Sequence, residues 1–268
     1  MFVWPQPPRC PGLFVTGTDT GVGKTAVVRG LAAVLGDRDR GPTPPRVGLC
    51  KPFATGCRLT RTGWAGEDLD ALAAAAGLDP GDAAARARLC PQAFKLPAAP
   101  AAAAEHERRG VDFAAVGRAL AEHDRRSDLV IVEGIGGPKV PLDPTRPRYT
   151  VAEFAADLGY PVLVVARAGL GTLSHTAMSV ESLQAAGCRV VGLVVSDAAD
   201  AAAEDPTAQS NPAWLERLTG IKVLARLPHH RQLPPVGPFP AALRAPLARV
   251  DWADLAGVPP RASEPASW

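Results

Sequence analysis

Residues 17–25 read Gly-Thr-Asp-Thr-Gly-Val-Gly-Lys-Thr, and this stretch decides the fold. It follows a short apolar run, Leu13–Val15, and precedes an Ala/Val/Leu-rich stretch, Ala26–Leu35, that has the composition of a helix. A strand, a glycine-rich turn and a helix in this order predict a phosphate-binding loop, because the N–H groups of the turn and the positive end of the helix face phosphate oxygens. We expect Lys24 to contact the terminal phosphates and Thr25 to hold a magnesium ion that bridges them.

The loop is one residue longer than the usual motif. Gly17 and Gly23 enclose five residues, whereas the usual motif has four between its first glycine and the final Gly-Lys. Partner-switching ATPases of the MinD type carry an extra lysine five positions before the loop lysine, and Asp19 stands there in this chain. This difference argues against membership in the MinD type. The loop residues predicted to bind nucleotide are Gly21, Val22, Gly23, Lys24, Thr25 and Ala26.

Composition narrows the class of protein. The chain has 268 residues, an apolar fraction of 47% and a net charge of only +2, so we expect a buried core and neither nucleic acid nor an anionic membrane as partner. No run approaches the roughly 18 apolar residues of a membrane helix, and Met1–Pro11, with four prolines, does not have the pattern of a signal peptide. Five scattered cysteines without a C-x-x-C pair are typical of reduced thiols. We therefore expect a cytoplasmic protein.

Apolar, β-branched runs alternate with helical stretches along the chain, which predicts a parallel sheet covered by helices on both faces. We expect a single P-loop NTPase-like α/β domain at 13–258, after an extended segment 1–12 and before a tail 259–268. The predicted strands are Leu13–Thr16, Val47–Cys50, Leu129–Val132, Val162–Ala166, Val190–Val195 and Val223–Ala225. The predicted helices are Ala26–Leu35, Asp68–Ala76, Phe113–His123, Val151–Leu158, Leu173–Ala186 and Pro212–Leu218. Loops are predicted at Arg38–Arg46, Pro138–Arg148, Pro206–Pro212 and Pro234–Pro240.

Two charged residues stand at the carboxyl ends of predicted strands, the edge where parallel sheets bind ligands. Lys51 ends the second strand, and we expect it to stabilise charge that develops during phosphoryl transfer. Glu133 ends the third strand, and we expect it to complete the magnesium shell. The alternative for each is an ordinary surface residue at a strand end. The turn after Glu133 would bring backbone close to phosphate or substrate through Gly134, Ile135 and Gly136.

A second carboxylate for magnesium is expected near residue 70. Asp68 and Asp70 both open a predicted helix, where a carboxylate is also favoured simply as a cap. We favour Asp68 as the ligand, and the sequence does not separate the two. The five histidines show no metal-ligand spacing, and structural or loop roles are the default for them.

Together these segments resemble dethiobiotin synthetase over about residues 13–230. The resemblance rests on six motifs that occur in order, of which the first is the most specific. They are Gly-Thr-Asp-Thr-x-Val-Gly-Lys-Thr at 17–25, Lys-Pro-x-Ala-Thr-Gly at 51–56, Ala-Pro-Ala-Ala-Ala-Ala-Glu at 99–105, Val-Glu-Gly-x-Gly-Gly at 132–137, Pro-Leu-Asp-Pro at 141–144 and Leu-Gly-Thr-Leu-Ser-His at 170–175.

The resemblance implies a ring closure that depends on Mg²⁺ and ATP. In that family 7,8-diaminopelargonic acid takes up CO2 as a carbamate, ATP phosphorylates the carbamate, and the neighbouring amine closes a cyclic urea. The family works as a homodimer, and the loop 169–175 would reach the partner's site. The implied catalytic residues are Lys51, Lys24 and Thr20. The implied substrate contacts are Thr20, Thr55, Gly136 and Val140. The implied nucleotide contacts, besides the P-loop and the segment 133–136, are Asp68, Ser196, Asp197, Pro228, His229 and His230.

Several positions depart from the family pattern. Gly21 replaces a glutamate and Ile135 an alanine, while Pro138-Lys139 replaces a more apolar pair near the substrate contacts. Ser196-Asp197 replaces Asn-Asp, whose asparagine reads the adenine ring, and Ser174 also replaces an asparagine. Two other hypotheses stay open. One is another carboxyl-activating ligase of the same fold, either a relative of the cobyrinic-acid amide synthetases or a paralogue with a different amine substrate. The cobyrinate enzymes carry a glutaminase domain with a nucleophilic cysteine, and this sequence shows no motif for one. The other is a non-catalytic nucleotide switch, against which Lys51 and Asp19 argue.

Overall fold

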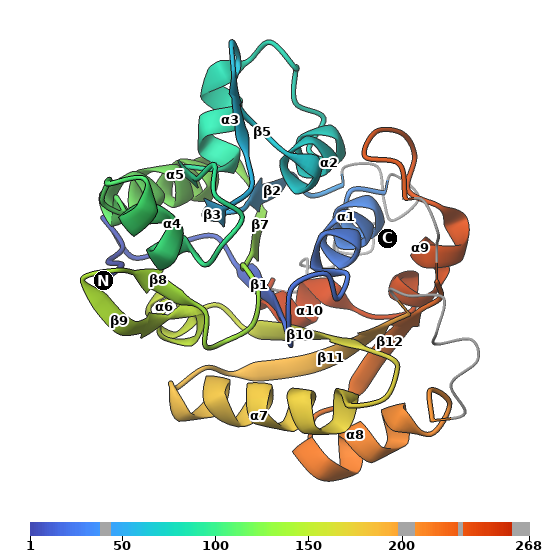
Figure 1. The fold of residues 1–268 in the computed structure, drawn as a ribbon. Helices are drawn as coiled ribbons and strands as arrows, with labels where there is room; N and C mark the ends of the chain where they lie inside the picture. The colour runs from blue at the N-terminus through green and yellow to red at the C-terminus, as the bar shows by residue number, and fades with distance from the viewer. Residues whose placement is uncertain (38–43, 198–206, 230–232, 259–268) are drawn as a thin grey trace, which may run out of the picture.

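The computed structural model describes residues 1–37, 44–197, 207–229 and 233–258. Within these residues the central sheet is six-stranded and entirely parallel (Figure 1). Its spatial order is β12 (Val223–Leu227), β11 (Val190–Ser196), β10 (Val162–Arg167), β1 (Gly12–Gly17), β7 (Leu129–Glu133) and β2 (Val47–Cys50). The strand that leads into the P-loop therefore lies in the interior of the sheet.

Both faces of the sheet are buried, which is why the strands are apolar throughout rather than alternating. In β1, Phe14 packs into one hydrophobic cluster, while Leu13 and Val15 pack into the cluster on the other face. All three side chains are inaccessible to solvent. The α/β fold with a P-loop is thus confirmed.

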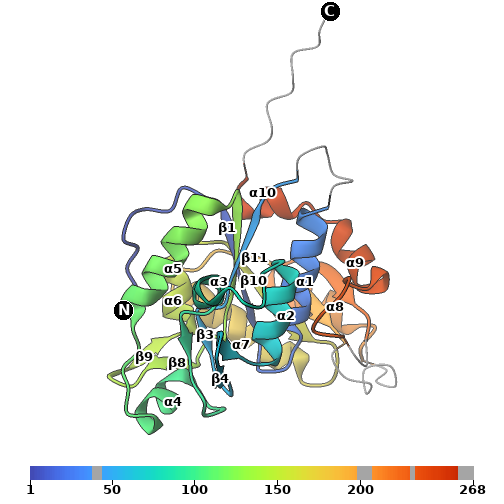
Figure 2. The same cartoon turned by 90° about the horizontal axis from the view of Figure 1, so that it is seen from above.

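Helices cover each face of the sheet, with α5 and α6 on one side in Figure 2 and α1, α2 and α9 on the other. The helices that pack on the first face are α5 (Phe113–Arg126), α6 (Val151–Leu158), α7 (Thr172–Ala185) and α8 (Asn211–Thr219). Those on the second face are α1 (Lys24–Leu35), α2 (Glu67–Ala75), α3 (Ala83–Leu89), α9 (Ala241–Ala248) and α10 (Trp252–Ala256).

The six predicted strands and six predicted helices are all present, and the structure adds short elements that the pattern did not predict. Residues 138–148, predicted as a proline-rich loop, contain β8 and most of β9, because proline is tolerated in a two-stranded edge hairpin. The added elements are α3, α9, α10, α4 (Pro100–His106), β3 (Phe53–Ala54), β4 (Arg58–Thr60), β5 (Gly63–Ala65), β6 (Gln92–Ala93), β8 (Pro141–Asp143) and β9 (Arg146–Thr150).

The N-terminal segment packs against the domain. Phe2 is 1% exposed, its ring packs edge-on against Trp4 and Phe154, and its backbone N–H donates to the Tyr149 hydroxyl. The Trp4 indole N–H donates to the carbonyl of Leu158. The segment therefore completes the core on the α6 face.

We expect Phe2→Ala to destabilise the fold by about 3 kcal/mol, because it removes a large buried ring and leaves a cavity. Urea unfolding would measure the loss. Val3→Ala, at a 69% exposed position in the same segment, should stay near the stability of the unmodified chain. Equal stability of the two variants would show that the segment does not contribute to the folded core.

Among the described residues, no helix has both the length and the apolarity that crossing a membrane requires. The cysteines are all free thiols, and burial raises the pKa of Cys50, which lies next to Lys51. Burial fits the packing role expected for this thiol.

Candidate active site

The P-loop connects β1 to α1 through backbone that only glycine adopts easily. Gly21 and Gly23 have φ of 73° and 99°, in the left-handed region, and Gly23 caps the N-terminus of α1. A Cβ at Gly23 would lie 2.5 Å from the hydroxyl oxygen of Ser196. The loop is therefore held tightly against the end of β11, with its first helical turn at Lys24 and Thr25.

Lys24 is buried against its own loop. Its Nζ donates a hydrogen bond of 2.6 Å to the carbonyl oxygen of Asp19, and the residue is only 7% exposed. Burial lowers the pKa of Lys24 to about 8, and the nearby charge of Lys51 also lowers it. At neutral pH the ammonium is still mostly protonated, so it can attract an anionic ligand.

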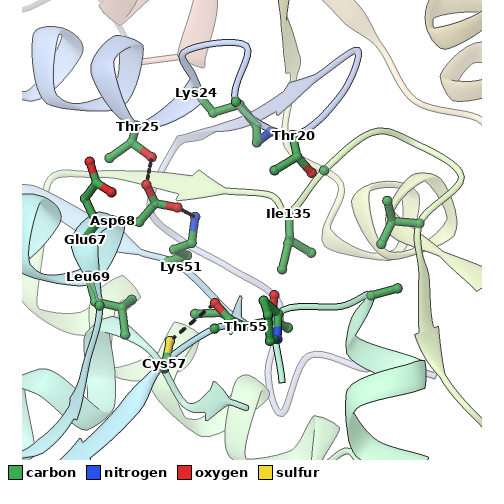
Figure 3. A pocket seen from close by; sticks show the side chains of 18 of the residues that line it. Thr20, Lys24, Thr25, Lys51, Thr55, Cys57, Glu67, Asp68, Leu69 and Ile135 are labelled. Atoms are coloured by element: carbon green, nitrogen blue, oxygen red, sulfur yellow. Dashed lines mark hydrogen bonds and ion pairs between the residues drawn. The ribbon is translucent and has the colours of Figure 1, made fainter. Parts of the chain in front are cut away.

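Four side chains from four segments meet beside the P-loop, and Figure 3 shows three of them, Thr25, Lys51 and Asp68. The Thr25 hydroxyl oxygen lies 2.9 Å from Asp68 Oδ1 and 2.9 Å from Glu133 Oε1. Lys51 Nζ lies 3.0 Å from Asp68 Oδ2 and also forms an ion pair with Glu133 Oε1. The strand ends at β2 and β7 and the first turn of α2 thus converge on the start of α1.

Glu133 and Lys51 form a buried ion pair, while Asp68 opens to the surface. The side chains of Glu133 and Lys51 are 0% and 4% exposed, compared with 55% for Asp68. Burial raises the pKa of Glu133 despite Lys51 beside it. Burial alone would lower the pKa of Lys51, but the charges of Glu133 and Asp68 outweigh it and raise that pKa. For Asp68 the Lys51 charge and its hydrogen bonds outweigh burial and lower the pKa.

The donor set suits a hard cation. Thr25, Asp68 and Glu133 offer only oxygen atoms, which Mg²⁺ prefers. Glu133 Oε2 is buried and has no hydrogen-bond partner among the described residues, so one carboxylate oxygen remains available. The described part of the chain contains no cluster of three or more His, Cys, Asp or Glu side chains that could hold a metal. The hydroxyl of Thr25 beside two carboxylates is the arrangement typical of P-loops.

Asp70 faces away from this cluster. Its Oδ1 lies 2.9 Å from Arg86 Nη1 of α3, whereas the Thr25 hydroxyl contacts Asp68. Neither Asp68 nor Asp70 caps α2, because Gly66 occupies the N-cap. The geometry brings Asp68, and not Asp70, to the start of α1.

A cavity of about 650 Å³ opens next to the cluster. The predicted site residues that line it are Thr20, Gly21, Gly23, Lys24, Thr25, Lys51, Thr55, Asp68, Ile135, Gly136 and Val140. Glu133 lies beneath it, Val22 is buried, and Gly134 donates its N–H to Val15. Ala26 lies one residue further along α1 and does not line the cavity. At Gly136, φ is 60° and a Cβ would lie 2.6 Å from Val140, so this turn closes tightly on Val140.

Sequence reasoning missed part of the cavity wall. Cys57 and Leu69 line it, as do Pro97–Ala99, which lead into α4. Of the three residues Pro97–Ala99, only Ala99 carried a signal, as the first residue of the motif at 99–105. Cys57 carried no signal of its own, because a lone cysteine is usually a packing residue.

The residues predicted to read the base lie at the ends of β11 and β12, outside this cavity. Ser196 is 6% exposed and sits against Gly23. Asp197 is engaged by Arg226, with Oδ2 3.0 Å from Nη2, and its carbonyl oxygen lies 2.8 Å from His229 Nδ1. Pro228 is exposed next to them. His230 falls outside the described residues.

A parallel sheet whose interior strand ends in this loop, with lysines, a hydroxyl and carboxylates gathered around it, defines a P-loop nucleotide-binding protein. The family model AAA_26, described as an AAA domain, matches residues 11–236. The chain is similar to ATP-dependent dethiobiotin synthetase BioD of Anaeromyxobacter dehalogenans strain 2CP-C, with 44% identity over 81% of this chain and 89% of that protein. The same synthetase of Anaeromyxobacter sp. strain Fw109-5 is 41% identical over 83% of this chain and 92% of that protein. The dethiobiotin synthetase of Bacillus subtilis strain 168 is 33% identical over 81% of this chain and 87% of that protein.

The chain therefore belongs to the AAA_26 family and, within it, to the ATP-dependent dethiobiotin synthetases. The resemblance inferred from the six motifs is confirmed. Among solved structures, the MinC:MinD cell division protein complex of Aquifex aeolicus covers 84% of both chains at 12% identity with a TM-score of 0.46, which is too low to carry a conclusion.

Proposed function

We propose that this chain closes the ring of dethiobiotin from 7,8-diaminopelargonic acid, CO2 and ATP. The observation that carries the proposal is the position of Lys51. Lys51 lines the cavity, and its ammonium contacts Asp68 and Glu133, the two carboxylates that the P-loop Thr25 hydroxyl also contacts. A nucleotide switch does not need a second lysine beside its phosphate loop. An enzyme that transfers a phosphoryl group to a carbamate does need one, to stabilise the charge that develops.

Each residue is assigned a role from its position along the cavity. Lys24 binds the terminal phosphates of ATP, and Lys51 stabilises the negative charge that grows as the carbamate oxygen attacks phosphorus. Thr20 and Thr55, which line the cavity on either side of Lys51, donate hydrogen bonds to the carbamate or the diamine end. Gly136 and Val140 contact the substrate chain, and the apolar surface of Ile135 excludes water from the anhydride. The carbamate is itself the nucleophile, so no general-base triad is required.

Magnesium would be held by Thr25, Asp68 and Glu133. When bound, it neutralises charge on the phosphate oxygens. Asp68 is the ligand of choice over Asp70, because Arg86 already engages Asp70.

The proposed enzyme works as a homodimer in the cytoplasm. Leu170, two residues before α7, and Met178, within that helix, are 82% and 56% exposed. A partner subunit packed over α7 would cover both side chains, and the segment 169–175, which forms the turn before α7 and its first residues, would then reach the partner's cavity.

The direct test is incubation with 7,8-diaminopelargonate, bicarbonate, Mg²⁺ and ATP, followed by mass spectrometry. Formation of dethiobiotin with release of phosphate is expected. ATP hydrolysis stimulated by another diamine, without dethiobiotin, would favour a related ligase with a different substrate. Nucleotide binding with no turnover on any diamine would favour a non-catalytic switch.

Glu133→Gln should raise the Mg²⁺ concentration required for half-maximal turnover by about tenfold or more, since even outer partners of metal ligands contribute that much. The change keeps the size of the side chain and removes its charge. Titration of turnover with Mg²⁺ measures the effect. Glu67→Gln is the matched control, because Glu67 lines the same cavity, while the carboxylates that contact Thr25 and Lys51 are those of Asp68 and Glu133. An unchanged titration in Glu133→Gln would assign the metal to another carboxylate.

The enzyme should discriminate poorly between nucleoside triphosphates. Ser196 offers one hydroxyl where an asparagine presents both a donor and an acceptor to the adenine edge, and it is buried against Gly23. We expect CTP or GTP to support ring closure within roughly tenfold of ATP, equivalent to about 1.4 kcal/mol. Turnover measured side by side with each triphosphate checks this. A thousandfold preference for ATP would mean that other groups, such as backbone near Pro228, read the base.

A further inference from the structure

The Lys51 ammonium occupies the centre of the oxygen cluster. It lies 3.0 Å from Asp68 Oδ2 and is ion-paired with Glu133 Oε1, and this Glu133 oxygen is also 2.9 Å from the Thr25 hydroxyl oxygen. Two of the three side chains proposed to hold a divalent cation thus already contact one positive charge, and the third, Thr25, contacts the same two carboxylates. The pairing is well shielded, because the Lys51 side chain is only 4% exposed.

A divalent cation and this ammonium cannot both use these oxygens. Two positive charges at ligand distance from the same carboxylates would repel strongly in a buried site. Leaving either Glu133 or Lys51 unpaired in the interior is also costly. Glu133 Oε2 has no partner, but it belongs to the carboxylate that the ammonium already neutralises. A metal ion that takes both carboxylates as ligands must therefore displace Lys51 Nζ from Glu133 Oε1 and Asp68 Oδ2, and the displaced ammonium needs another anion.

The geometry points to Lys51 as a resident counter-ion that excludes divalent cations until a phosphate or carbamate anion draws its ammonium into the cavity. The inference rests on the proposed function for the identity of the metal ligands. It adds a binding order, in which metal enters together with nucleotide and binds only weakly alone. Lys24 reinforces that order, because it faces the same cavity and adds repulsion for a cation without phosphate. Asp19 and Glu67 are the nearby acids outside the cluster; Asp19 pairs with Arg167 at 3.7 Å, and Glu67 stands in the first turn of α2.

The test measures Mn²⁺ binding with no nucleotide or diamine present, by the electron paramagnetic resonance signal of free Mn²⁺. Lys51→Met keeps the length of the side chain and removes the charge, and it should bind Mn²⁺ at least about tenfold more tightly than the unmodified chain. Lys51→Arg keeps the charge and should bind as weakly as the unmodified chain. The double variant Lys51→Met with Glu133→Gln should lose the increase in Mn²⁺ affinity that Lys51→Met alone produces. Equal Mn²⁺ affinity in the unmodified chain and Lys51→Met would overturn the inference.

A second measurement covers the case in which Lys51→Met folds poorly, since it leaves buried carboxylates unpaired. Binding of metal to the folded state alone raises the melting temperature, and tighter binding gives a larger rise at the same metal concentration. MnCl2 should therefore raise the melting temperature of Lys51→Met clearly more than that of the unmodified chain. An equal or smaller rise in the variant would overturn the inference. Neither measurement uses turnover, so failure here and failure to form dethiobiotin are separate results.

Discussion

Lys24→Ala is expected to lower the affinity for ATP by roughly ten- to a hundredfold, the equivalent of losing one hydrogen bond to a charged group, and turnover should fall with it. In the structure the Lys24 ammonium already donates a hydrogen bond within the loop, to the carbonyl oxygen of Asp19. A bound phosphate would take over this donor at little cost in side-chain entropy, because Lys24 is buried and ordered beforehand. Isothermal titration calorimetry with ATP measures the loss.

The matched control is Lys222→Ala. Lys222 is exposed and immediately precedes β12 (Val223–Leu227), at the amino end of the sheet and opposite the site. Its replacement should leave ATP affinity unchanged, which separates a local contact from a change in net charge. Normal ATP affinity in Lys24→Ala would remove the basis for assigning residues 17–25 to phosphate binding.

The sheet and the P-loop could be predicted because local sequence determines them. Strands buried on both faces must be apolar along their whole length, so runs such as Val162–Ala166 stand out without any tertiary information. The carboxyl ends of parallel strands share one edge, and this places Lys51 and Glu133 at the same edge as the loop. Prediction succeeded where a single physical constraint acts along a continuous stretch.

The contacts of the site could not be predicted, because they join segments far apart in sequence. Nothing local distinguishes Asp68 from Asp70; the difference comes from Arg86 of α3, which pairs with Asp70. The helix α3 is itself too short to give a clear periodic signal. Likewise Phe2 gave no sign of burial, since its partner Phe154 lies on α6 and the segment between Met1 and Pro11 is rich in proline.

Lys51→Ala should bind ATP nearly as well as the unmodified chain and yet form dethiobiotin at least about a hundredfold more slowly, the usual loss for one contact that acts on developing charge. Lys51 pairs with Glu133 and Asp68 rather than with the P-loop backbone, so its loss leaves the Lys24 contact to the phosphates in place. Its charge matters most while the carbamate oxygen attacks phosphorus, because stabilisation limited to the transition state changes kcat and not binding.

Calorimetry with ATP and single-turnover formation of dethiobiotin, measured on the same preparation, separate these two effects. Thr55→Val is an informative companion, because Thr55 lines the same cavity and its loss removes a hydrogen bond without changing any charge. It should raise KM more than it lowers kcat, the reverse of the pattern in Lys51→Ala. If Lys51→Ala kept more than about a third of the turnover, on the scale expected for such a contact, the lysine would not be acting on the transferred phosphoryl group. Its position between Glu133 and Asp68 would then reflect only its role as counter-ion to the two carboxylates.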